Sequence, residues 1–154
     1  MREMLQFYID GKWVDPVTPD TLDVINPATA EICGRISLGS AADVDLAVAA
    51  ARRAFATYSQ TTREERMQLL QSILDEFAKR HDDVAEAIMD EMGAPWGLAR
   101  NAQAASGPQH IKAALRALKN FAFEERNRTT LIKKEPIGVC GLITPWNWPI
   151  NQIA

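Results

Sequence analysis

The sequence predicts an α/β protein in which strands and helices come in separate blocks. Short runs of β-branched and aromatic residues, divided by turn signals, occupy the first 36 residues. From about residue 40 to residue 121, apolar residues recur at spacings of three and four, which is the period of an amphipathic helix. Near the end, the uninterrupted apolar run from Ile137 to Ile143 is typical of a strand covered on both faces of a parallel sheet.

Composition narrows the class of protein. The 154 residues are 47% hydrophobic and 24% charged, with a net charge of -3, which suits a globular domain. No basic stripe for nucleic acid and no basic amphipathic anchor for a membrane is present. The first ten residues do not have the pattern of a signal peptide, so we expect a cytoplasmic protein. Cys33 and Cys140 lie far apart in apolar surroundings and are expected to be buried and unlinked.

The first element is a β-hairpin. Strands at Phe7–Ile9 and Lys12–Val14 flank Asp10-Gly11, a pair that suits a two-residue turn because glycine tolerates a positive φ. A second strand pair is predicted at Leu22–Ile25 and Glu31–Ile36. The turn between the two strands is Asn26–Thr29, which contains asparagine and proline.

Four helices are predicted next. Ser40 with Asp43, and Thr62 with Glu65, have the spacing of capping boxes and therefore begin the first two. The third runs from about Asp82 to Met92 and is ended by Gly93 and Pro95, whereas Pro108 is expected in the first turn of the fourth. Their apolar stripes are Val44, Val48, Ala51 and Phe55; Met67, Leu70, Ile73, Leu74 and Phe77; Val84, Ala85, Ile88 and Met92; and Ile111, Leu115, Leu118 and Phe121.

Two strands are predicted after the helices. Thr129–Lys134 alternates poorly, so we expect an edge or an arm strand there. The apolar run Ile137–Ile143 needs parallel neighbours, and none is predicted elsewhere in the chain. We therefore expect those neighbours beyond Ala154.

The segment from Thr144 to Trp148 leaves the carboxyl end of that apolar strand, where open parallel sheets bind ligands. Asn147 carries a neutral amide donor in a stiff frame of two tryptophans and two prolines, and such a donor can stabilise an oxyanion. Spacing alone slightly favours the alternative, in which Asn147 only bonds local backbone in a turn. His81 and His110 are interpreted as ordinary helix residues, and no dinucleotide, P-loop or metal-ligand pattern occurs.

The chain resembles the aldehyde dehydrogenase superfamily from about Phe7 to Ala154. The most specific match is Pro145-Trp146-Asn147-Trp148-Pro149, preceded by the segment Glu135–Gly141. Further matches are Ile9–Val14, Ile25–Thr29 and the helix opening Gly39-Ser40. The resemblance makes the oxyanion role the leading interpretation of Asn147.

Members of this family oxidise aldehydes to carboxylic acids with NAD or NADP through a cysteine thiohemiacetal. The resemblance implies that Asn147 is catalytic and that the cofactor cleft is lined by Ile143, Thr144, Pro145, Trp146 and Asn147. The implied substrate positions are Trp148, Asn151 and Gln152. The carbonyl of Ile25 and Glu91 match a monovalent cation site, although aspartate is more usual than glutamate at the second position.

The resemblance also implies a homo-oligomer, a dimer or tetramer, built around a doubly wound cofactor-binding domain. Residues 1–121 would belong to the cofactor-binding domain, 122–135 to an oligomerisation arm, and 136–154 to the first sheet strand and active-site turn. The nucleophile, general base and catalytic domain would follow downstream, so the chain is expected to be an inactive N-terminal part of the enzyme. Two alternatives stay open: a non-catalytic interaction module that binds intact subunits, and part of a CoA-acylating relative.

Overall fold

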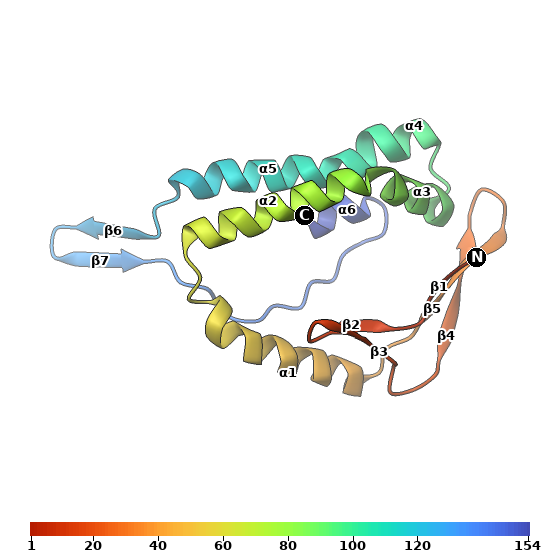
Figure 1. The fold of residues 1–154 in the computed structure, drawn as a ribbon, viewed down its shortest axis with the longest axis horizontal. Coiled ribbons are helices and arrows are strands. Elements are labelled where there is room, and N and C mark those ends of the chain that lie inside the picture. The colour runs from red at the N-terminus through yellow and green to blue at the C-terminus, as the bar shows by residue number, and fades with distance from the viewer.

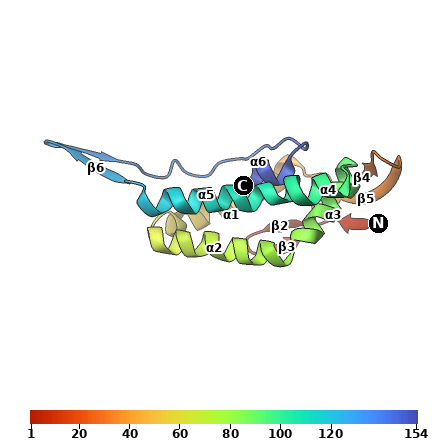
Figure 2. The same cartoon turned by 90° about the horizontal axis from the view of Figure 1, so that it is seen from above.

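The computed structural model describes residues 1–154 as an elongated, flat arrangement (Figure 1). Three of the N-terminal strands form a sheet at one end, and a hairpin of the other two reaches from it toward the middle. The helices form the middle, and a second β-hairpin projects from the other end. Figure 2, turned by 90°, shows how thin this layer is. None of the helices combines the length and the apolar character needed to cross a bilayer.

Five strands build the N-terminal end: β1 (Arg2–Met4), β2 (Phe7–Ile9), β3 (Lys12–Val14), β4 (Thr21–Asn26) and β5 (Glu31–Ser37). Both predicted pairs are confirmed, since β2 pairs with β3 and β4 with β5, each antiparallel. Asp10 and Gly11 have φ values of 55° and 77°, the left-handed conformations that a type I′ turn requires. The sequence analysis missed β1, which adds to β5 in parallel.

The first three helices are α1 (Ala41–Tyr58), α2 (Arg63–Lys79) and α3 (His81–Met92). Complete capping boxes begin α1 and α2 as predicted, with Ser40 and Asp43 at α1 and with Thr62 and Glu65 at α2. Gly93 ends α3 in a left-handed conformation with a φ of 66°. These ends follow from local side-chain chemistry, which explains why the sequence predicted them.

Pro108 is the fourth residue of α5, close to the first turn predicted for it, but the helical stretch begins well before α5. One nearly continuous helical stretch comprises α4 (Trp96–Leu98), the π-helix η1 (Ala99–Ala104) and α5 (Ala105–Asn120), with Pro108 inside α5. Proline has no N–H to donate to the carbonyl one turn earlier, and helices accommodate such losses at bends and π-turns. The wide turn η1 directly precedes the part of α5 that contains Pro108.

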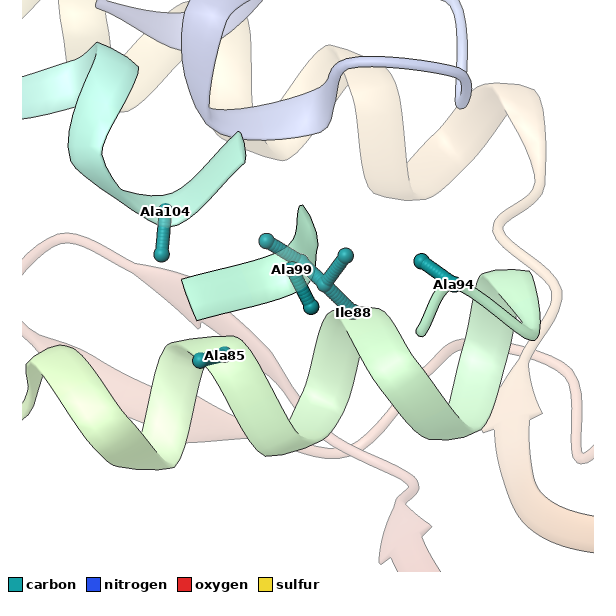
Figure 3. Packing of buried hydrophobic residues seen from close by; sticks show 5 residues of the cluster. All are labelled: Ala85, Ile88, Ala94, Ala99 and Ala104. Atoms are coloured by element: carbon teal, nitrogen blue, oxygen red, sulfur yellow. The ribbon is translucent and has the colours of Figure 1, made fainter. Parts of the chain in front are cut away.

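A small core lies where α3 faces this helical stretch. Its buried side chains are Ala85, Ile88, Ala94, Ala99 and Ala104, and the small residues let the two helices approach closely (Figure 3). Ile88 is the only large side chain among them and points between the alanines of the opposite stretch. No large side chain is fully buried, so this chain holds its helices together mainly through close backbone packing.

The projecting hairpin consists of β6 (Glu124–Asn127) and β7 (Thr130–Lys133). The strand predicted over Thr129–Lys134 is therefore present, whereas its partner β6 was not predicted. Every residue of both strands is exposed.

The buried strand predicted over Ile137–Ile143 does not form in this chain. The segment has no regular secondary structure, and Ile137 and Ile143 are 94% and 100% exposed. The physical reason is that no other strand of the chain lies beside it to pair with its backbone groups. Cys140 is consequently exposed rather than buried, and Cys33 is half-buried with its thiol 3.3 Å from the carbonyl of Val24.

Candidate functional site

The segment that carries Asn147 returns to the helices after this extended stretch. It ends in a short helix, α6 (Pro149–Ile153), which begins with proline in its first turn. The fixed φ of proline suits that position, and its missing N–H would have no partner there. In Figure 1, α6 lies beside α5, and its contacts are with α5 and η1.

Gln103 of η1 joins the helices directly to Asn147. Its side-chain Nε2 donates a hydrogen bond of 3.3 Å to the backbone carbonyl of Asn147. The Gln103 side chain is buried, with 5% exposure, and its Oε1 has no hydrogen-bond partner. This contact spans 44 positions of sequence and fixes the peptide group that follows Asn147.

Two further contacts hold α6. Gly107 faces Ile150 so closely that a Cβ at this position would overlap the Ile150 side chain. His110 Nε2 lies 2.6 Å from Asn151 Oδ1. Gln103, Gly107 and His110 follow one another at spacings of four and three, which places them on one face of the helical stretch. This face, hereafter the docking face, supports the turn and α6.

The positions expected to line a cofactor cleft are open. Trp146 is 80% exposed, and no backbone–backbone hydrogen bond of the chain involves residues 136 to 146. Their N–H and C=O groups are thus available to a ligand or to neighbouring strands. The positions expected near substrate are mixed: Trp148 and Gln152 are exposed, whereas Asn151 is half-buried against His110.

The residues expected at a cation site lie on different elements. Ile25 lies on β4, next to a register shift between Val24 and Ile25, and Glu91 is exposed on α3. The chain contains no group of three or more His, Cys, Asp or Glu side chains that could hold a metal ion. A monovalent cation held by the Ile25 carbonyl and Glu91 stays a prediction.

The turn can act only through neutral groups. No residue from Ile143 to Ile153 carries a titratable side chain. The shifted titrating groups lie elsewhere: the Arg100 guanidinium lowers the pKa of Asp82, and the Ser40 hydroxyl lowers the pKa of Asp43. Asp82 and Arg100 border a cavity of about 760 Å³ lined by α2, α3, η1 and α5, and no residue of the turn lines it.

Gln103 is the site residue that sequence reasoning missed. The stretch from Ala99 to Gly107 consists mostly of small residues and carries two amides, Asn101 and Gln103, and nothing in this pattern distinguishes Gln103 or names its partner. His110 was interpreted as an ordinary helix residue, yet it contacts the expected substrate position Asn151. Both contacts are long-range, so a local pattern could not reveal them.

Comparison with known proteins places the whole chain among aldehyde dehydrogenases. Residues 13–154 match the family described as "Aldehyde dehydrogenase family". A 3-succinoylsemialdehyde-pyridine dehydrogenase from a Pseudomonas species is 51% identical over 155 residues, which is 100% of this chain and 32% of that protein. A putative aldehyde dehydrogenase from Staphylococcus haemolyticus is 45% identical, again over 100% of this chain and 32% of its own length.

Solved structures agree on the fold. An aldehyde dehydrogenase from Bartonella henselae matches with a TM-score of 0.97 and 46% identity, over 99% of this chain and 33% of that one. Aldehyde dehydrogenase C from Pseudomonas syringae, complexed with NAD+ and octanal, matches with a TM-score of 0.94 and 47% identity, over 96% of this chain and 30% of that one. The chain therefore spans about a third of the length of the relatives that it matches.

Proposed function

The chain belongs to the aldehyde dehydrogenase family, and we propose that it supplies the oxyanion-stabilising part of an enzyme that oxidises aldehydes to carboxylic acids. A cysteine thiolate outside this chain would attack the aldehyde carbonyl, and negative charge would develop on the carbonyl oxygen. The Asn147 amide would donate a hydrogen bond to that oxygen. One preorganised donor of this kind is worth roughly 3 kcal/mol of transition-state stabilisation.

The observation that carries the proposal is the way in which Asn147 is held. Its backbone carbonyl is bonded to a buried amide, and α6 begins two residues later on the docking face. A neutral donor on a fixed backbone needs no reorganisation when charge develops, and this is what makes such donors effective. An asparagine that only shaped a surface turn would not need a buried partner from another helix.

The cofactor is proposed to be NAD or NADP, held partly by the free backbone groups of Ile143 to Trp146 and by Asn147. Two related solved structures are complexes with NAD+. When bound, the nicotinamide would accept hydride from the carbon that the thiolate has attacked. The resulting thioester would then be hydrolysed by water to the carboxylic acid and the free thiol. Trp148, Asn151 and Gln152 are proposed to face the substrate, with Trp148 as an apolar wall. The octanal in the P. syringae complex is consistent with an apolar tunnel in a relative.

The proposal is tested by replacing Asn147 with alanine in the complete enzyme that contains this chain. We expect kcat to fall by roughly 10²- to 10³-fold, because one preorganised donor is removed. The matched control is Asn101→Ala, an exposed amide in η1, which should leave kcat unchanged. An unchanged kcat for Asn147→Ala, with hydride transfer shown to be rate-limiting, would reduce Asn147 to a turn residue.

The chain alone is proposed to be inactive, because neither Cys33 nor Cys140 is placed to serve as the nucleophile. Cys33 lies on β5 beside the carbonyls of Val24 and Asp90, and Cys140 precedes the turn on the extended segment. The test follows NADH absorbance with NAD and a panel of aldehydes that includes octanal. Turnover abolished by thiol alkylation would contradict it.

The same panel, run with and without CoA on the complete enzyme, separates hydrolytic from acylating chemistry. CoA-dependent product formation would favour the acylating relative. Binding of the inactive chain to intact subunits, without any effect of Asn147→Ala on the complete enzyme, would favour the interaction module.

A further inference from the structure

We propose that Gln103 is a positioning residue for Asn147: its side-chain amide fixes the peptide group after Asn147 and so aims the oxyanion donor. This inference rests on the proposed function of Asn147, since it describes how another residue makes that function effective. Gln103 touches neither substrate nor cofactor in this proposal and acts only through the turn.

The first argument is rigidity at the base of the Gln103 side chain. The backbone carbonyl of Gln103 accepts a hydrogen bond of 2.7 Å from the Ser106 hydroxyl, and it shares the Ala105 N–H with the carbonyl of Ala102. The residue lies in a π-helix, a rare conformation that is frequently found at functional sites. A side chain that leaves so constrained a backbone can determine the position of the group it bonds.

The second argument is the unequal use of the two ends of the amide. Nε2 bonds the Asn147 carbonyl, whereas the buried Oε1 has no partner. An unpaired buried acceptor costs stability, and a single neutral hydrogen bond of 3.3 Å offsets only part of that cost. Replacing Gln103 is therefore expected to change the stability of the chain little, while it releases the Asn147 carbonyl.

The third argument is that the bond completes a set of contacts. Gly107 and His110, on the same docking face, hold Ile150 and Asn151 of α6. These two contacts lie after Asn147 and fix α6, but they do not fix the peptide group of Asn147 itself. Gln103 is the docking-face residue that bonds this peptide group, so it determines the direction from which the Asn147 side chain leaves the backbone.

The experiment compares Gln103→Met with wild type in the complete enzyme. Methionine keeps the length and removes both amide ends. We expect the single-turnover rate of NADH formation to fall roughly tenfold, because a small displacement of a positioned group costs up to about 10²-fold in rate. The urea midpoint should change little, and hydrogen exchange over residues 146–153 should become faster. Gln109→Met, an exposed glutamine on the same helix, is the matched control.

If Gln103 had only a structural role, the effect of Gln103→Met on the rate would not depend on whether Asn147 is present. The double variant therefore tests the positioning role directly. In an Asn147→Ala background, Gln103→Met should cause no further loss of rate, since the group it aims is gone. An additional tenfold loss in that background would overturn the proposal. Loss of rate for Asn147→Ala without any loss for Gln103→Met would overturn this inference alone, whereas no loss for Asn147→Ala would overturn the proposed function.

A second variant covers the case in which Gln103→Met fails to fold. Gln103→Asn keeps a polar amide but is one methylene shorter, so it cannot reach the Asn147 carbonyl in the same geometry. It should lose rate as Gln103→Met does, and a wild-type rate would overturn the inference.

Discussion

Gly107 lies at the closest approach between α5 and α6. The space that a Cβ would need at this position is occupied by the Ile150 side chain. Ile150 in turn packs against the small core around Ile88, so the missing side chain at Gly107 lets the end of the chain reach that core. At this point, the absence of a single methyl group determines where α6 and the turn that contains Asn147 are placed.

We therefore expect Gly107→Ala to displace α6 and destabilise the complete enzyme by about 1–3 kcal/mol, the usual cost of overpacking. Activity should fall as well, because α6 carries the turn that holds Asn147. The control is Gly97→Ala in α4, where a new methyl group meets no atom within 4 Å. The measurements are the unfolding temperature and kcat of the two variants. If Gly107→Ala and Gly97→Ala gave the same values, α6 would not need this close contact.

At the scale of residues, the sequence could single out Asn147 as a candidate site residue but could not predict its contact with Gln103. Asn147 belongs to a specific motif of adjacent residues, so a single short segment identifies it. Gln103 becomes visible only once two segments separated by 44 positions are in contact. Gly107 looks like an unfavourable residue within a helix until its neighbour Ile150 is known.

At the scale of elements, the start of α1 depends on a reciprocal pair. The Asp43 backbone N–H donates to the Ser40 hydroxyl, and the Asp43 carboxylate accepts from the Ser40 N–H and hydroxyl, at 2.8 and 2.7 Å. The same carboxylate accepts from the Val17 N–H, at 2.9 Å, and so ties the loop before β4 to the helix. The Ser40 hydroxyl is the main reason why the pKa of Asp43 lies below its ordinary value.

Ser40→Ala should therefore loosen the first turn of α1. We expect hydrogen exchange over residues 41–46 of the complete enzyme to become roughly fivefold faster at pH 6, which corresponds to about 1 kcal/mol for a lost cap. Because a lowered pKa stabilises the folded state only above the ordinary pKa of about 4, the difference should shrink as the pH falls below that value. Ser72→Ala, which removes an exposed hydroxyl within α2, is the control. An unchanged exchange rate for Ser40→Ala would contradict this account.

Elements whose ends depend on neighbours in sequence could be predicted, and elements that depend on distant partners could not. The caps of α1 and α2 and the turn at Asp10-Gly11 use residues within three positions of each other. The strand expected at Ile137–Ile143 requires neighbouring strands that the chain does not provide. β1 is three residues long and is defined only by its pairing with β5.

At the scale of the whole molecule, the chain exposes far more surface than a compact protein of its mass. Its accessible surface is 11168 Å², whereas a folded monomer of 17.1 kDa is expected to expose about 7,800 Å². Much of the excess is apolar, including the segment from Ile137 to Ile143 and the side chains of Leu131 and Ile132 on β7. The hairpin of β6 and β7 also stands free of the helices, as Figures 1 and 2 show. Apolar surface of this extent normally marks a contact with other protein surface.

We therefore expect the isolated 154-residue chain to self-associate. Burying one large apolar side chain is worth roughly 1.5–3 kcal/mol, so several exposed ones provide a strong drive toward association. Unpaired backbone groups on the extended segment and on the hairpin edges add sites for strand pairing between chains. Light scattering across a concentration series should show an average mass that rises with concentration.

The variant Ile137→Lys/Ile143→Lys should lower that mass, because it removes apolar surface and adds charge repulsion. Gln68→Lys/Gln109→Lys, which adds equal charge at exposed polar positions, should lower it less. A monodisperse monomer of the unchanged chain at high concentration would show that these apolar residues find cover within the chain itself.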